Sequence, residues 1–169
     1  ATKGVKKPAY IVIDRNATMA MPIVDEIEAV HDSEEKIFIS EEEALDMLTP
    51  RSLVIVVDTH SPDFVESKEL LNEAQRVVVI DHHRMMVKHI DNAVVFYHEP
   101  YASSASEMVS ELVQYIGNTV LSKEEADALL AGIMLDTKNF VLKSGVRTFE
   151  AAAYLRRRGA DTVVVKKMF

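Results

Sequence analysis

Five short aliphatic segments recur at regular intervals along the first hundred residues of this 169-residue chain. They are rich in β-branched residues and are separated by longer amphipathic stretches, which is the alternation of strands and helices in a mostly parallel sheet. The predicted strands are residues 9–14, 36–39, 53–57, 77–80 and 93–97. Because these segments are apolar at consecutive positions, we expect helices to cover both faces of the sheet. The sequence therefore predicts an α/β fold.

The remaining segments are predicted to be helical, and after residue 100 the chain has helical patterns only. The predicted helices are residues 20–30, 41–48, 64–75, 105–116, 123–139 and 148–159. Serine followed three positions later by glutamate is the capping-box pattern, which opens a helix. It occurs three times, as Ser40 with Glu43, Ser104 with Glu107 and Ser122 with Glu125. The fold class is thus a mostly parallel sheet flanked by helices, followed by a helical C-terminal part.

Composition excludes several classes of function. The formal net charge is −8, whereas affinity for duplex nucleic acid or an anionic membrane needs a cationic surface. The chain contains no cysteine, so it has no disulfide framework and no thiolate metal site, which fits a reducing compartment. No apolar run approaches the ~20 residues of a membrane span.

Acids and histidines follow two of the predicted strands. Asp58 comes directly after residues 53–57, and Asp81, His82 and His83 come directly after residues 77–80. The two acids are 23 residues apart, a spacing that fits one strand-helix-strand unit, so both clusters should lie at the same edge of the sheet. Ligands of open α/β sheets bind outside the carboxyl ends of the strands, which is where these residues fall.

A third acid is found by helical periodicity. Leu129, Ile133, Asp136 and Phe140 are spaced four, three and four residues apart, which predicts that Asp136 lies on the core-facing side of its helix. A buried carboxylate is costly unless a cation or hydrogen-bond donors meet it. Carboxylates with imidazole and no thiol suit Mn²⁺ or a similar divalent cation better than structural zinc. We therefore predict a metal site.

Simpler interpretations stand beside this one. Asp58 could be only a turn residue or a helix N-cap, because aspartate is favoured in both places. We interpret His31, His60 and His89 as packed or solvated histidines rather than ligands. The triplet of Asp81, His82 and His83 is harder to explain without a site, because three adjacent polar groups at a sheet edge need partners.

These residues resemble the motifs of the DHH phosphoesterase superfamily, which includes single-strand exonucleases, manganese pyrophosphatases and phosphodiesterases acting on short oligonucleotides or cyclic-di-AMP. "VVVIDHHR" looks like its signature, "VVDTHSPD" resembles its second motif and "LLAGIMLDTKNF" its fourth. "YHEPYASSASEMVSELV" and "SGVRTFEAAAYLRRRGAD" are most similar to the bacterial membrane-anchored cyclic-di-AMP phosphodiesterases. The resemblance covers nearly the whole chain.

The resemblance implies a role for each residue that matches a motif. Asp58 would bridge two Mn²⁺ ions, and His82 and Asp136 would ligate the second ion. His83 would stabilise charge on the substrate phosphate, and Asp81 would orient an imidazole from behind. The two ions would clamp a phosphodiester and activate a bridging water, opening cyclic-di-AMP to linear pApA. Arg147 and Lys138 are candidates for phosphate contacts, although each is also explained as a solvated surface charge.

One motif of the family has no match here. Its first motif is a histidine followed by an acid-x-acid pair, and Asp14 follows a strand without either. We therefore expect residues 1–169 to be a single DHH domain that lacks the first motif and the C-terminal substrate-binding lobe. Such a chain should bind metal weakly and hydrolyse cyclic-di-AMP little or not at all.

The resemblance also bears on partners and location. We expect a cyclic dinucleotide or a short linear oligonucleotide as substrate, and a cytoplasmic domain whose parent protein is membrane-anchored. The alternative function is a non-catalytic α/β module that binds nucleotide or metal without turnover. An unpaired sheet edge would favour self-association into a homodimer.

Overall fold

The computed structural model describes residues 7–16, 18, 20–30, 36–116 and 121–168. The described residues form two compact units. The sheet unit takes its residues from 10–19 and 36–100, and the helical unit takes its residues from 1–9, 20–35 and 101–169.

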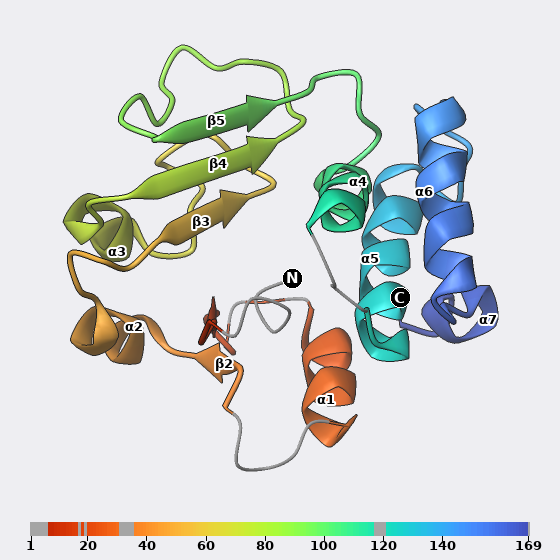
Figure 1. Ribbon diagram of the computed structural model, residues 1–169, viewed down its shortest axis with the longest axis horizontal. Coiled ribbons are helices and arrows are strands. Elements are labelled where there is room, and N and C mark those ends of the chain that lie inside the picture. The colour runs from red at the N-terminus through yellow and green to blue at the C-terminus, as the bar shows by residue number, and fades with distance from the viewer. Residues whose placement is uncertain (1–6, 17, 19, 31–35, 117–120, 169) are drawn as a thin grey trace. The chain divides into compact units, whose positions relative to one another are not determined.

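The sheet unit contains two parallel sheets (Figure 1). One pairs β1 (Ile11–Val12) with β2 (Phe38–Ile39), and the other has the order β3 (Val54–Val57), β4 (Val77–Asp81), β5 (Val95–His98). The three arrows of the larger sheet point the same way in Figure 1, as parallel pairing requires. Each strand overlaps one of the five predicted segments, so the parallel α/β architecture is confirmed.

One face of the larger sheet carries the core of this unit. Val77 and Val79 of β4 are buried in a cluster with Leu71, Ala74 and Ile90, which brings helix α3 (Lys68–Glu73) onto the sheet. Helix α2 (Glu41–Met47) packs against β2 and α3 in a second cluster.

The opposite face of β3 differs from the prediction. Ile55 and Val57 are 50% and 51% exposed, although we expected strands covered on both faces. A run of consecutive apolar residues shows that a strand can be buried on both sides, but what covers each side depends on contacts from elsewhere in the fold. Only the face with the alternate residues Val54 and Val56 packs in the described core.

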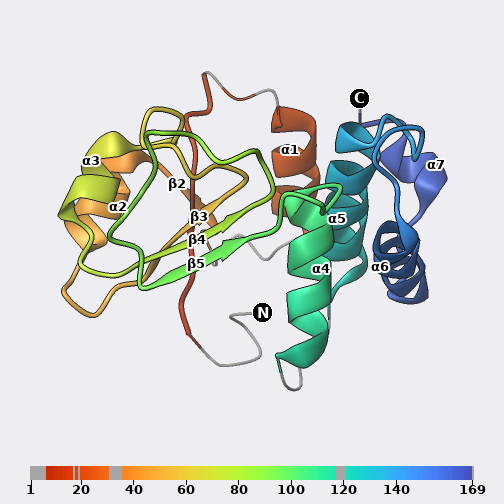
Figure 2. The ribbon, with the colours of Figure 1, turned by 90° about the horizontal axis from the view of Figure 1, so that it is seen from above.

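The helical unit is built around three helices that lie side by side in Figures 1 and 2: α4 (Ala105–Tyr115), α5 (Lys123–Asp136) and α6 (Val146–Arg157). Helix α1 (Met21–Val30) and the short α7 (Thr162–Val165), which was not predicted, contact α5. Leu130, Ile133 and Leu155 are fully buried in the core of this unit. The predicted helical C-terminal part is confirmed.

Serine side chains open four of the helices. The capping boxes at Ser40 and Ser122 are confirmed, with each serine hydroxyl accepting from the glutamate N–H and each glutamate accepting from the serine N–H. Ser67 caps α3 by accepting from the Leu70 N–H. Ser104 also caps its helix, accepting from the Glu107 N–H at 3.0 Å.

The prediction that Asp136 faces the core is wrong, because Asp136 is exposed. The buried stripe of α5 runs through Ala126, Leu130, Ile133 and Thr137. This stripe has the same four, three and four spacing as the predicted one and shares Ile133 with it. Two adjacent stripes therefore fit one periodicity, and Leu129, from which the prediction started, is only half-buried.

Helix α5 ends in a left-handed turn. Lys138, Asn139 and Phe140 have φ values of 48°, 58° and 65°, a region that costs a non-glycine residue ~1–2 kcal/mol. The buried Thr137 holds the turn, because its hydroxyl donates to the Ile133 carbonyl at 2.7 Å and accepts from the Phe140 N–H at 2.9 Å. In the part of the chain that the structure describes, no helix has the length and apolarity needed to cross a bilayer.

Candidate metal centre

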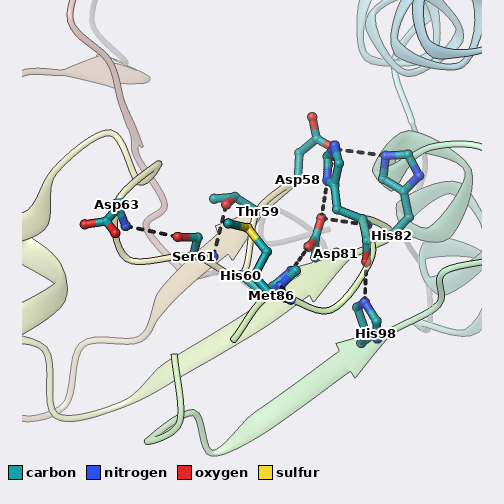
Figure 3. A network of polar contacts seen from close by, with 10 residues as sticks. Asp58, Thr59, His60, Ser61, Asp63, Asp81, His82, Met86 and His98 are labelled. Carbon is teal, nitrogen blue, oxygen red and sulfur yellow. Dashed lines mark hydrogen bonds and ion pairs between the residues drawn. The ribbon is translucent and has the colours of Figure 1, made fainter. Parts of the chain in front are cut away.

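The carboxyl ends of β3 and β4 bring the predicted residues together. Val57 is paired with Ile80, so Asp58 and Asp81 follow side by side, as predicted. Asp58 has a φ of 64°, an uncommon left-handed conformation for a residue with a side chain. Its N–H still donates to the Ile80 carbonyl at 3.0 Å. The chain therefore turns sharply at Asp58, and Figure 3 shows its carboxylate beside His82, which follows β4.

Asp58, His82 and His83 form a group that could hold a metal ion, because each offers a ligand atom within 4.8 Å of the others. Nε2 of His82 lies 3.3 Å from Oδ1 of Asp58, and Nδ1 of His83 lies 3.9 Å from the same oxygen. His82 is buried, whereas Asp58 and His83 are exposed. The carboxylate of Asp58 and Nε2 of His82 are donors that suit Mn²⁺ or another divalent cation, so these two side chains fit such an ion.

Asp81 lies behind this group and is fully buried. Its Oδ2 accepts a hydrogen bond from Nδ1 of His60, and its Oδ1 accepts from Nδ1 of His83 at 2.8 Å and from the His83 N–H at 3.3 Å. Burial alone would raise the pKa of Asp81, but these hydrogen bonds stabilise the anion and hold the pKa below its usual value. Asp81 is therefore a carboxylate, and both histidines donate to it.

His60 and His98 form a second group with Asp81 whose ligand atoms also lie within 4.8 Å of one another. Both ring nitrogens of His60 and Nε2 of His98 are already used. Nε2 of His60 accepts from the Met86 N–H at 2.8 Å, and Nε2 of His98 donates to the His83 carbonyl at 2.5 Å. A nitrogen engaged in this way cannot offer a lone pair to a metal at the same time. We therefore interpret this second group as a support for the first.

Asp136, Lys138 and Arg147 belong to the helical unit. Asp136 is the last residue of α5, and Lys138 begins the left-handed turn that follows it. Arg147 makes a two-pronged ion pair with Glu111, with contacts of 2.8 and 2.6 Å, and lines an open groove that also contains Arg157. Arg147 is thus paired with an acid and is not simply a solvated charge.

The remaining sequence predictions have mixed outcomes. The capping box predicted at Ser104 and Glu107 is only half correct, because the buried Glu107 carboxylate accepts from the hydroxyl and N–H of Ser103 instead of the Ser104 N–H. His89 is exposed, as expected of a solvated histidine, and its Nδ1 contacts the Val87 carbonyl. His31 lies outside the described residues.

Comparison with known proteins identifies the family. Residues 9–133 match the N-terminal domain of the DHH family. The chain belongs to the DHH family.

Relatives and solved structures agree with this assignment. The chain is 46% identical over 166 residues to the cyclic-di-AMP phosphodiesterase GdpP of Geobacillus thermodenitrificans, covering 96% of this chain and 25% of the relative. It is 38% identical over 99 residues to a probable manganese-dependent inorganic pyrophosphatase of Thermotoga maritima, covering 56% of this chain and 16% of that protein.

The fold is that of a solved structure, an exopolyphosphatase-related protein from Bacteroides fragilis, which matches with a TM-score of 0.68 and 20% identity over 99% of this chain and 58% of that one. Compared with the curated relatives, the chain is short: it spans about a quarter of the length of GdpP.

Sequence reasoning missed two residues of this DHH site. We interpreted His60 as a packed or solvated histidine, and His98 was not considered. The usable signal was the position of Asp81 at the end of a predicted strand, because polar groups at a sheet edge need partners. His60 follows β3, two residues beyond Asp58. Because β3 and β4 are parallel, their carboxyl ends lie at the same edge of the sheet, so His60 comes close to Asp81. His98 is paired with Asp81 across β4 and β5, which sequence alone does not establish.

Proposed function

We propose that the chain provides the metal-binding part of a phosphodiesterase that hydrolyses cyclic-di-AMP to linear pApA. The observation that carries the proposal is the convergence of Asp58, His82 and His83 at the carboxyl ends of two parallel strands in a DHH chain. The name of GdpP, with 46% identity over 166 residues, supports a cyclic dinucleotide as the substrate.

The carboxylate of Asp58 and Nε2 of His82 would hold the ion, and we propose Asp136 as a further ligand. The absence of thiols among these side chains, and the manganese named for the Thermotoga relative, favour Mn²⁺. When bound, two such ions neutralise the phosphodiester and activate water for attack at phosphorus. Because Asp58, His82 and Asp136 are few ligands for two ions, we expect weak binding and little turnover by this chain alone.

His83 would act on the substrate directly. Its Nδ1–H is held by Asp81 at 2.8 Å, and its ring is about half exposed, so Nε2 remains for a phosphate oxygen. A protonated imidazole there would donate a hydrogen bond to charge that develops during attack. Lys138 and Arg147 are proposed as further phosphate contacts. Arg147 would have to break its ion pair with Glu111 before its guanidinium could bind a phosphate.

Two properties of the assembly follow as proposals. The cysteine-free sequence fits a reducing compartment, so we place the domain in the cytoplasm, within a membrane-anchored parent protein. An unpaired edge strand offers a route to a homodimer, which light scattering after size exclusion would detect as a doubled mass.

Calorimetric titration of the chain with Mn²⁺ at pH 7.5 tests the proposal, with His82→Ala as the disrupting variant and His89→Ala as the matched control. His89 is an exposed histidine of the same unit that belongs to neither ligand group. We expect saturable binding in the chain and in His89→Ala, and loss of binding in His82→Ala.

Hydrolysis is followed in the same samples by chromatography of cyclic-di-AMP and pApA, with a short linear oligonucleotide as the second substrate. Formation of pApA that depends on Mn²⁺ and on His82 supports the proposal. Cleavage of the linear substrate alone would favour an oligonucleotide phosphodiesterase. Metal binding that His82→Ala leaves intact would refute the assigned site.

A further inference from the structure

His60 is a buried histidine whose two ring nitrogens both have defined partners. Nδ1 contacts Oδ2 of Asp81, and Nε2 accepts from the Met86 N–H at 2.8 Å. Only 1% of the residue is exposed. Because a backbone N–H must donate and a carboxylate must accept, His60 is the neutral tautomer with its proton on Nδ1.

The carboxylate of Asp81 is held from two sides. His60 donates to Oδ2 and His83 donates to Oδ1, so the two oxygens have different partners and the carboxylate plane is fixed between them. Without the His60 bond, Oδ2 would be a buried acceptor with no described partner, which is costly. The carboxylate would then be drawn to rotate toward other donors, and Oδ1 would leave the position in which it meets His83.

The ring of His60 is itself fixed. A flip about its Cβ–Cγ bond would replace Nδ1 and Nε2 by carbon atoms at Asp81 and at the Met86 N–H, and both hydrogen bonds would be lost. The rings of Phe96 and His98 contact it edge-on, with centroids 6.3 and 5.5 Å away. Figure 3 shows His60 next to Asp81, with Met86 beside it.

We propose that His60 is a positioning residue that acts through Asp81 to set the orientation and tautomer of His83. The inference rests on the proposed function, in which Nε2 of His83 meets the substrate phosphate. His60 fixes Asp81, and Asp81 holds the Nδ1–H of His83. The ring is thereby oriented with Nε2 toward the solvent side, where the protonated imidazole proposed above would donate to the phosphate. His98 assists from the other side by holding the His83 carbonyl at 2.5 Å. Carboxylates that orient imidazoles from behind are a common device in metal sites.

Two substitutions separate this role from simple support of the chain near Met86. In His60→Asn the amide nitrogen takes approximately the place of Nδ1, so the bond to Asp81 is kept and the acceptor for the Met86 N–H is lost. In His60→Gln the amide oxygen takes approximately the place of Nε2, so the acceptor for Met86 is kept and the donor to Asp81 is lost. Circular dichroism of both variants is compared with that of the wild type to check that they fold.

The first readout is the imidazole ¹⁵N spectrum of the full chain, which does not require activity. We expect His83 to show a protonated Nδ1 in the wild type and in His60→Asn. In His60→Gln we expect His83 to lose this single tautomer and to give a mixture. A His83 signal unchanged in His60→Gln, or equally changed in both variants, would overturn the inference.

The second readout is hydrolysis of cyclic-di-AMP with saturating Mn²⁺. We expect kcat to fall about 10- to 100-fold in His60→Gln with KM nearly unchanged, because the loss affects an interaction with the reacting phosphate. His60→Asn should retain most of the activity. If both variants lose activity equally while His83 keeps its tautomer, the inference is wrong. If the spectra behave as expected but His82→Ala leaves Mn²⁺ binding intact, the proposed function fails and the positioning role stands.

Discussion

The left-handed backbone of Asp58 predicts that its site is built at the expense of stability. At a φ of 64° a residue with a Cβ costs ~1–2 kcal/mol, whereas glycine adopts this conformation freely but loses ~0.5–1 kcal/mol more chain entropy on folding. Asp58→Gly and Asp58→Ala both remove the carboxylate, so the difference between them isolates the backbone. We expect Asp58→Gly to be more stable than Asp58→Ala by about 0.5–1 kcal/mol.

Asp58→Asn completes the series, because asparagine tolerates the left-handed region better than alanine. We expect it to be at least as stable as Asp58→Ala while losing the charge that the ion needs. All three variants should therefore lose saturable Mn²⁺ binding. Gain of stability together with loss of binding would show that function maintains the strain.

The assay is urea and thermal unfolding in the presence of EDTA, followed by calorimetry with Mn²⁺. For a chain of this size, 1 kcal/mol corresponds to a shift of roughly 2–4 °C in Tm. Asp63 is the matched control, because it is an acid of the same unit without a positive φ. There the order should reverse, with Asp63→Ala more stable than Asp63→Gly. An Asp58→Ala variant as stable as Asp58→Gly would refute the strain argument.

Two further predictions concern the helical unit. A Cβ at Gly132 would lie 2.1 Å from Oγ and 2.9 Å from Cβ of Ser106, so Gly132→Ala should destabilise the chain by ~1–3 kcal/mol despite its better helix propensity. Adding Ser106→Gly should recover most of this in chemical unfolding, and a lack of recovery would contradict the assigned contact. Thr137→Val removes the hydroxyl that closes the turn after α5 and should cost ~1–3 kcal/mol, whereas Thr137→Ser should cost less. Equal losses in the two variants would argue against the hydroxyl.

Much of the sheet unit was predictable because its signals are local. Consecutive apolar residues mark the strands, and the parallel order makes their carboxyl ends meet, so Asp58 and Asp81 could be placed side by side before any coordinates. The boxes at Ser40 and Ser122 are equally local, since each depends on residues three positions apart.

Other features depend on contacts that the sequence does not specify. The exposure of Asp136 was missed because two stripes of α5 share one spacing and only tertiary packing selects between them. The exposed face at Ile55 could not be predicted, since an apolar strand does not specify what covers it. His60 was underestimated for a related reason. Its role becomes visible only when Met86 and Asp81 are seen on opposite sides of one ring.

The register of β5 on β4 links correct folding to the site. Asp81 is paired with His98, and Val79 with Phe96, so His98 reaches the His83 carbonyl while Phe96 packs against the core. A slip of one residue would turn every side chain of β5 to the opposite face of the sheet. The core contact and the hydrogen bond would then be lost together. A chain with a misaligned β5 would lack both the core contact of Phe96 and the hydrogen bond of His98. A register that keeps the site intact is therefore also the register that completes the core.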